Sequence, residues 1–183
     1  MPRECRRPER PVLTIDPVKQ VFDALDLREW LIVKLGVIGG MRCSEIIGLR
    51  RGRIGEASAE IVERVCKRDI DTPKTRKSVR LAALSSGLAS DIRLWLENSP
   101  DSGPEGWLFP SENLARPVGT ENVLNRNIRP RLEALRLAWI DYRVMRRTHA
   151  SLISEKGVDP RLVADQQRHT VDVNQNVYTK LSC

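Results

Sequence analysis

The chain reads Gly40-Met41-Arg42-Cys43-Ser44-Glu45 where an apolar helix, predicted from Leu27 to Gly39, gives way to a short one. Arg42 therefore stands at a helix start, beside backbone N–H groups that have no partner within the helix, and such a place suits an anion. Glu45 lies one helical turn further on and is placed to orient the guanidinium. The same residues also fit an ordinary capping turn with a surface arginine.

Outward from this turn, the spacing of apolar residues predicts a mainly helical chain. Helices are expected from Pro17 after a cap at Asp16, from Leu88 to Glu97 after a cap at Ser86, from Thr120, from Pro130, from Tyr142 to Lys156, from Pro160 to about Gln167 and from Val173 to Lys180. Short strands are expected near Ile54, from Ala59 to Cys66 and from Val79 to Leu84. The predicted fold is α+β, mainly α with a small antiparallel three-stranded β-sheet.

The composition indicates one basic domain with an aliphatic core. The chain has 183 residues, of which 40% are hydrophobic but only 4% aromatic. Lys and Arg number 31 against 24 Asp and Glu, which gives a formal charge of +7 and a pI of about 9.6. This balance favours a polyanion such as nucleic acid as the partner, although charge alone fits a solvated basic surface equally well.

The division of the chain into an N-terminal arm and a domain, and its cysteines, indicate the cellular compartment of the protein. Residues 1–12 are predicted to be a basic arm or linker remnant, and residues 13–183 to form the domain. No secretory signal and no apolar run of membrane-spanning length is evident, so no membrane partner is expected. The four cysteines form neither a CxxC pair nor a metal-ligand spacing with the two histidines; they are Cys5, Cys43, Cys66 and Cys183. The simplest interpretation is a cytoplasmic protein with reduced thiols and no metal site.

Three further clusters carry groups suited to phosphate chemistry. Residues 73–77, Pro-Lys-Thr-Arg-Lys, look like a hairpin tip, either a solvated one or an arm whose lysine donates a proton to a leaving oxygen of DNA. Arg143 and Arg146 are three residues apart on a predicted helix, so they are expected to share a face, and Arg146 or its neighbour is placed to clamp a phosphate. His169 is followed nine residues later by Tyr178. Each cluster alone fits an ordinary surface or packing role.

In order and spacing, these clusters resemble the catalytic domain of the tyrosine recombinase, or phage integrase, family. The family's G-x-R-x-S-E box is matched by residues 40–45, and its hairpin lysine by Lys74 followed by Ser78-Val79-Arg80-Leu81. Further matches are an L-F-P element at Leu108-Phe109-Pro110, the end of an H-x-L-R-H/R-T box at Met145-Arg146-Arg147-Thr148, and the interval between His169 and Tyr178. The resemblance spans about Leu13 to Thr179.

The resemblance implies a DNA strand transferase that needs neither a metal nor ATP, so no cofactor is expected. Tyr178 would attack the scissile phosphorus, displace a 5′-hydroxyl and form a 3′-phosphotyrosyl link, which conserves the free energy of the broken bond. Arg42 and Arg146 would clamp the non-bridging oxygens. His169 would donate a further hydrogen bond to the phosphate.

The same resemblance implies double-stranded DNA as the partner, held mainly through its phosphates. Lys74 would protonate the leaving 5′-oxygen, with Lys77 as the alternate. Contacts to the DNA are expected from Arg50, Arg51, Arg53, Lys67, Arg76, Lys77 and Arg147. Relatives assemble as oligomers on DNA and carry an N-terminal DNA-clamping domain. A homo-oligomer on DNA is therefore expected here, and the sequence is expected to lack the clamping domain.

Departures from the family pattern leave the activity open. Arg143 occupies the place of a general-base histidine, and an arginine does not accept a proton at neutral pH, so slower chemistry or a water base is expected. Gln167 and Arg168 replace the leucine and glycine that precede the second histidine in the family. Three functions therefore remain: a site-specific recombinase or integrase, a catalytically impaired DNA-binding remnant of one, and a type IB topoisomerase, which shares the chemistry.

Overall fold

A computed structural model of the chain describes residues 11–66, 69–71, 80–100, 103–159 and 161–162. Its helices are α1 (Ile15–Asp23), α2 (Leu27–Val37), α3 (Cys43–Ile47), α4 (Ser86–Asn98), α5 (Thr120–Asn122), α6 (Arg129–Glu133) and α7 (Tyr142–Glu155). Its strands are β1 (Ser58–Ile61), β2 (Arg64–Cys66), β3 (Asp69–Asp71) and β4 (Arg80–Ala83). A 3₁₀ turn (Arg51–Arg53) follows α3, and a π-helical stretch (Val123–Ile128) joins α5 to α6.

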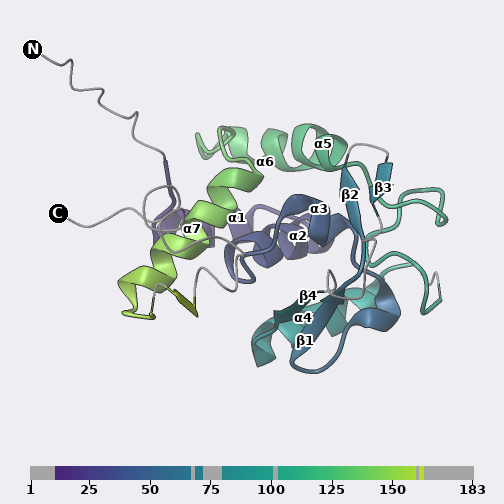
Figure 1. The fold of residues 1–183 in the computed structure, drawn as a ribbon. Coiled ribbons are helices and arrows are strands. Elements are labelled where there is room, and N and C mark those ends of the chain that lie inside the picture. Colours follow the sequence, from purple (N-terminus) through teal and green to yellow (C-terminus); the bar gives the residue numbers. More distant parts are fainter. Residues whose placement is uncertain (1–10, 67–68, 72–79, 101–102, 160, 163–183) are drawn as a thin grey trace, which may run out of the picture.

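Helix α2 lies at the centre of the molecule, and the other helices and the strands surround it (Figure 1). The side chains from Leu31 to Val33 are buried, as are Leu35 and Val37. The intervening Lys34 places its Nζ 2.5 Å from Oδ2 of Asp91 in α4. A helix that is apolar on nearly every side must be covered on nearly every side, and α2 accordingly contacts α1, α3, α4 and α7.

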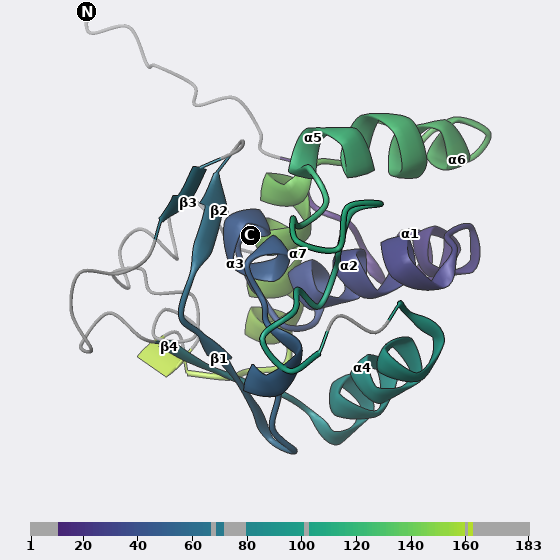
Figure 2. The same ribbon diagram turned by 90° about the vertical axis from the view of Figure 1, so that its right-hand side faces the viewer.

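The elements form three layers, which are visible in both ribbon views (Figures 1 and 2). The upper layer holds α5 and α6, the middle layer holds α1, α2 and α3, and the lower layer holds α4 with β1 and β4. Helix α7 passes from beside α6 down the side of α2. Helices that are distant in sequence, α2 and α7, are thereby packed against one another beside the start of α3.

The apolar element at Trp107 to Pro110 ties α4 to the rest of the core. Trp95 of α4 donates its indole N–H to the carbonyl oxygen of Leu108 at 2.7 Å, and its ring lies 5.8 Å from that of Phe109. Trp107, Leu108 and Phe109 are all buried. A tryptophan that is buried needs a partner for its N–H, and this bond supplies one. Trp95 and Phe109 therefore form one aromatic contact of the core, and Phe22 with Trp30 forms another at 6.5 Å.

The predicted three-stranded sheet is not formed within the described residues, which contain two antiparallel two-stranded sheets instead. β1 pairs with β4 and β2 pairs with β3, while Ile54 makes an isolated bridge to Ala59. The predicted strand from Ala59 to Cys66 is interrupted because Glu63 is held elsewhere. Its carboxylate pairs with Arg50 at 2.6 Å, and its carbonyl oxygen packs against Gly48, where a Cβ would lie 2.5 Å away. The chain therefore leaves β4 at this point and pairs with β3.

Several predicted helix ends are also corrected. Helix α1 is capped at Thr14 and α4 at Ser85, whose hydroxyl accepts the Leu88 N–H at 3.3 Å, rather than at Asp16 and Ser86. The predicted separate helices from Thr120 and Pro130 form one continuous helical run, 120–133. A proline ring clashes with the carbonyl four residues earlier, and a π-helical stretch before it relieves the clash without ending the helix.

The helices predicted from Pro160 and from Val173 lie outside the described residues except for residues 161–162, which are helical. No helix in the described part of the chain is both long and apolar enough to cross a bilayer.

Leu35→Ala is expected to lower the free energy of unfolding by about 3 kcal/mol, because a fully buried leucine leaves a cavity when it is truncated. The matched control is Leu94→Ala, since Leu94 is 46% exposed and its loss should change the free energy by less than about 0.5 kcal/mol. Urea denaturation of both variants measures the two values. Similar losses would contradict the central place of α2 in the core.

Candidate active site

Arg42 is held at the start of α3 by the carboxylate of Glu45. The Arg42 backbone N–H donates to Oε2 of Glu45 at 3.0 Å, and the Arg42 guanidinium donates from Nη1 to Oε1, also at 3.0 Å. Glu45 is fully buried, whereas the Arg42 side chain is 32% exposed. One carboxylate thus satisfies a backbone group at the helix start and fixes the side chain of the same residue, which stays partly exposed.

A second arginine, Arg80, reaches the same carboxylate from strand β4. Its Nη1 donates to Oε2 of Glu45 at 2.6 Å, and its side chain is 5% exposed. Arg80 was expected only to be part of a strand, and no role was predicted for it. The missed signal is the alternation of β4, in which position 80 points inward like Ala82. An arginine at an inward position requires a buried anion as its partner.

Arg146 approaches this turn from α7. Its Nη1 donates to the carbonyl oxygen of Gly40 at 2.6 Å, and the residue is 4% exposed. Gly40 comes two residues before Arg42, so two arginines more than one hundred residues apart in sequence lie at one turn. A second hydrogen bond joins α7 to the N-terminal segment, in which the Thr148 hydroxyl accepts the Leu13 N–H at 2.9 Å.

His149, one turn after Arg146, fills the space beside Gly40. Its Nδ1 lies 3.1 Å from the carbonyl oxygen of Val37, and a Cβ at Gly40 would lie 2.6 Å from the imidazole ring. Burial lowers the pKa of His149 to about 4, and the charge of Arg146 lowers it further, against the hydrogen bond to Val37. A neutral imidazole therefore donates from Nδ1 to the end of α2. No role for His149 was predicted, since one buried histidine on an apolar helix carries no signal of its partner.

The charges around this turn sum to a positive site. Burial acts to raise the pKa of Glu45, but the neighbouring Arg80 and Arg42 outweigh burial and hold the pKa below its usual value. Glu45 is therefore ionised, while His149 stays neutral, and among the described residues of this turn three guanidinium groups accompany this carboxylate. The partly exposed side chain of Arg42 suits a phosphate oxygen. No cluster of three or more potential metal ligands occurs in the part of the chain that the structure describes.

The other predicted cations on α7 lie apart from this turn. Arg143 is exposed, while Arg146 is buried, so the expected shared face is divided between solvent and core. Two residues three apart on a helix differ by about 60° in direction, which is enough to separate them here. Arg147 is half-buried and donates from Nε to the carbonyl oxygen of Arg143 at 3.2 Å.

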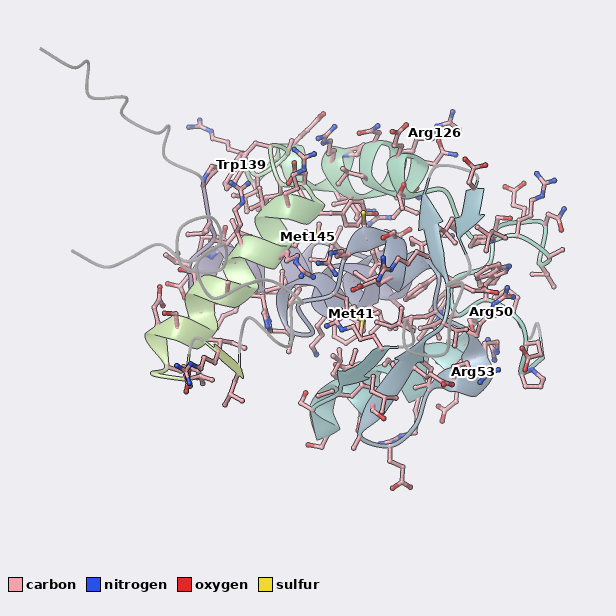
Figure 3. The ribbon with its side chains drawn as sticks, in the orientation of Figure 1. Met41, Arg50, Arg53, Arg126, Trp139 and Met145 are labelled. Atoms are coloured by element: carbon pink, nitrogen blue, oxygen red, sulfur yellow. The ribbon has the colours of Figure 1, made fainter. Side chains whose placement is uncertain are left out.

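The predicted DNA-contacting arginines after α3 make contacts within the chain. Arg50 stacks over the Trp107 ring at 3.3 Å and pairs with Glu63 at 2.6 Å. Arg51 donates to Ser99 and to two backbone carbonyls at the end of α4, and Arg53 pairs with Glu60 at 2.8 Å. Figure 3 shows Arg50 and Arg53 beside the strands, away from Met41 and Met145 in the interior. DNA binding by these arginines stays a prediction, with a structural role now evident for each.

The remaining predicted site residues lie outside the described residues. They are Lys67, Lys74, Arg76, Lys77, His169 and Tyr178. The chain's other tyrosine, Tyr142, is described: its hydroxyl donates to the carbonyl oxygen of Thr120 at 3.2 Å. Burial raises the pKa of Tyr142 well above its ordinary value, so its phenol stays protonated.

The geometry thus places Arg42 and Arg146 at one turn, at the start of α3, within a helical domain with small sheets. The model of the phage integrase family matches residues 11–183, and the chain belongs to this family. No curated protein matches the sequence.

Solved structures of tyrosine recombinases share the fold. XerA recombinase is 21% identical with a TM-score of 0.73, and covers 96% of this chain. The Tn1549 transposon integrase in complex with circular intermediate DNA is 16% identical with a TM-score of 0.78, again over 96% of this chain. XerH recombinase bound to a palindromic difH substrate is 18% identical with a TM-score of 0.68 over 93%. The chain spans 62%, 65% and 49% of these three proteins.

Gly40→Ala is expected to destabilise the fold more than Gly157→Ala. Both glycines have a positive φ, +62° and +73°, so either alanine adopts a left-handed backbone at a cost of about 1 kcal/mol. A Cβ at Gly40 also lies 2.6 Å from the His149 ring, whereas no described atom lies within 4 Å of one at Gly157. Chemical denaturation should give a loss of about 1 kcal/mol for Gly157→Ala and roughly 2 kcal/mol or more for Gly40→Ala. Equal losses would show that the imidazole moves aside freely.

Acidification from pH 7 to pH 5 is expected to destabilise the protein through His149. Its pKa is about 4 in the folded chain against 6.5 for an ordinary histidine, so between these values the unfolded state binds more protons. Stability therefore falls as the pH falls, by about 2 kcal/mol over this interval. In His149→Asn, whose amide nitrogen can replace Nδ1 beside Val37, this part of the pH dependence should vanish. Urea titrations at both pH values test this, and parallel losses in the two proteins would contradict it.

Proposed function

We propose that the chain is the catalytic domain of a site-specific DNA recombinase or integrase, which cuts and rejoins DNA through a 3′-phosphotyrosyl intermediate. The observation that carries the proposal is the meeting of Arg42 and Arg146 at one turn. Arg42 is fixed by Glu45 at the start of α3, and Arg146 reaches the carbonyl of Gly40 from α7. The family membership of residues 11–183 supports the same class of chemistry.

The two arginines would bind the non-bridging oxygens of the scissile phosphate. A phosphodiester is anionic and repels nucleophiles, and the pentavalent transition state carries more charge on these oxygens. Arginine stays ionised, and its donors match a phosphate in geometry. Because the arginines are held by Glu45 and Gly40 before any DNA binds, little reorganisation is needed when the charge develops.

The nucleophile in this proposal is Tyr178. The alternative phenol, Tyr142, is held protonated by burial and by its bond to the Thr120 carbonyl, so it is unsuited to attack. Attack by the Tyr178 oxygen on phosphorus would form the P–O bond of the phosphotyrosine and release the 5′-oxygen. Lys74, with Lys77 as the alternate, would supply the proton to that oxygen, and His169 would donate to the phosphate.

The partner in this proposal is double-stranded DNA, and an oligomer assembled on it. Two of the similar structures are recombinases in complex with DNA, the Tn1549 integrase with its circular intermediate and XerH with its difH substrate. The formal charge of +7 supports a polyanionic partner. Binding to phosphates would make the affinity fall steeply with salt.

A second function, DNA binding without cleavage, is favoured by one specific observation. Arg143 stands where relatives carry a general-base histidine, and it is exposed rather than packed beside Arg146. An arginine there cannot accept the phenol proton, so either water takes it or cleavage is lost. The two functions differ in whether a covalent protein–DNA adduct forms.

Incubation with a nicked DNA, in which a cleaved fragment diffuses away, tests the proposal by trapping the adduct on a denaturing gel. The wild-type chain should form the adduct, and Tyr178→Phe should form none, because the attacking oxygen is gone. Tyr142→Phe is the matched control and should still form the adduct. Persistence of the adduct in Tyr178→Phe would refute the assigned nucleophile.

Absence of any adduct from the wild-type chain, together with DNA binding that weakens steeply with salt, would select the non-cleaving function instead.

A further inference from the structure

The strongest cluster outside the predicted site residues is the contact between β4 and the start of α3. Arg80 and Glu45 are both buried, at 5% and 0% exposed, and pair at 2.6 Å. The chemistry proposed above assigns Arg80 no step, and its guanidinium donates to the Glu45 carboxylate. A buried ion pair is costly to desolvate and is often no more stable than an apolar pair of the same volume. The presence of this ion pair beside Arg42 therefore indicates a role other than stabilising the fold.

The Glu45 carboxylate links Arg80 to Arg42 through its two oxygens. Oε2 accepts both the Arg80 guanidinium at 2.6 Å and the Arg42 backbone N–H at 3.0 Å, and Oε1 accepts the Arg42 guanidinium at 3.0 Å. A carboxylate rotates about one bond, so fixing Oε2 also fixes the place of Oε1. The arginine of β4 thus sets the orientation of the group that holds the arginine of α3.

We infer that Arg80 is a positioning residue that acts through Glu45 to hold the Arg42 guanidinium in the orientation that receives a phosphate oxygen. The inference rests on the proposed function for its catalytic consequence, but the positioning itself is a property of the chain alone. Among the described residues, removal of Arg80 leaves the buried Glu45 paired with the partly exposed Arg42 alone. The carboxylate is then free to turn or to take up a proton, and Arg42 loses its fixed partner.

Arg80→Met tests the inference, with Arg80→Lys as the conservative variant and Arg131→Met as the control. Methionine keeps much of the volume but removes the cation, whereas lysine keeps a cation that can still reach Glu45. The control removes one positive charge from the surface pair that Arg131 of α6 forms with Asp26. All variants are compared at a temperature at which circular dichroism shows each to be folded.

The first measurement is the rate of adduct formation on nicked DNA at saturating DNA concentration. Arg80→Met should lower this rate roughly 100-fold, because a misplacement of about 1 Å at the reacting group has this effect. The DNA dissociation constant should change by less than about threefold, because the Arg80 guanidinium donates to Glu45 rather than to a phosphate. Arg80→Lys should recover most of the rate, and Arg131→Met should keep it. A folded Arg80→Met with the wild-type rate would overturn the inference.

Two comparisons separate positioning from general weakening of the fold. DNA with a methyl group in place of one non-bridging oxygen at the cleavage position needs the Arg42 charge less, so the loss in Arg80→Met should shrink on it. The losses of Arg80→Met and Glu45→Gln should also fail to add in the double variant, because both act on the same group. Equal loss on both substrates, or full additivity, would contradict a role through Glu45.

The last measurement requires no activity, so it stands apart from the proposed function. Amide hydrogen exchange followed by NMR should show the Arg42 N–H exchanging at least about tenfold faster in Arg80→Met than in Arg131→Met. Unchanged protection of this amide would overturn the inference even if the enzyme is active. Faster exchange in Arg80→Met, together with a wild-type chain that forms no adduct, would instead uphold the positioning and refute the proposed function.

Discussion

The arrangement of the site depends on the ionised carboxylate of Glu45, which no solvent reaches. Two guanidinium groups from different elements and one backbone N–H converge on its two oxygens. Buried ions of one sign are tolerated only with ions of the other sign beside them, so each group here makes the others possible. The first turn of α3, the beginning of β4 and the Arg42 side chain are therefore one unit, although the sequence places them in separate segments.

Helix α7 completes this unit by supplying donors to carbonyls that α2 and its turn leave without helical partners. Arg146 reaches Gly40, and His149 reaches Val37 at the last turn of α2. The last carbonyls of a helix carry partial negative charge, which favours a cation or an N–H donor at this end. Close approach requires that position 40 have no side chain, because the imidazole occupies the space of its Cβ. Hydrogen bonding at the end of one helix thus brings the second arginine beside the first.

The sequence predicted the parts of this arrangement that depend on local pattern. The apolar α2, the helix from Tyr142, the glycine turn and the proximity of Glu45 to Arg42 all follow from spacings within a few residues. Arg80 and His149 were missed because their partners, Glu45 and Val37, are distant in the sequence. The alternation of β4 indicates that Arg80 points inward, but it does not indicate which residue Arg80 pairs with. The division into two sheets depends likewise on Glu63 being held by Arg50, a contact between side chains of different segments. Arg143 and Arg146 were expected to share a helix face, but a spacing of three does not decide how far around the helix the core extends, and only Arg146 of the two is buried.

The distribution of the anion-binding groups along the chain has a bearing on synthesis. Arg42, Glu45 and Arg80 lie in the first half of the sequence, while Arg146 is on the final helix that the structure describes in full. A nascent chain that has released only α1 to α4 from the ribosome contains the carboxylate and its two arginines, but not the contact from α7. The complete set of cations therefore exists only after α7 has emerged and packed on α2. The charge that would bind a phosphate is thus a property of the finished fold rather than of any peptide within it.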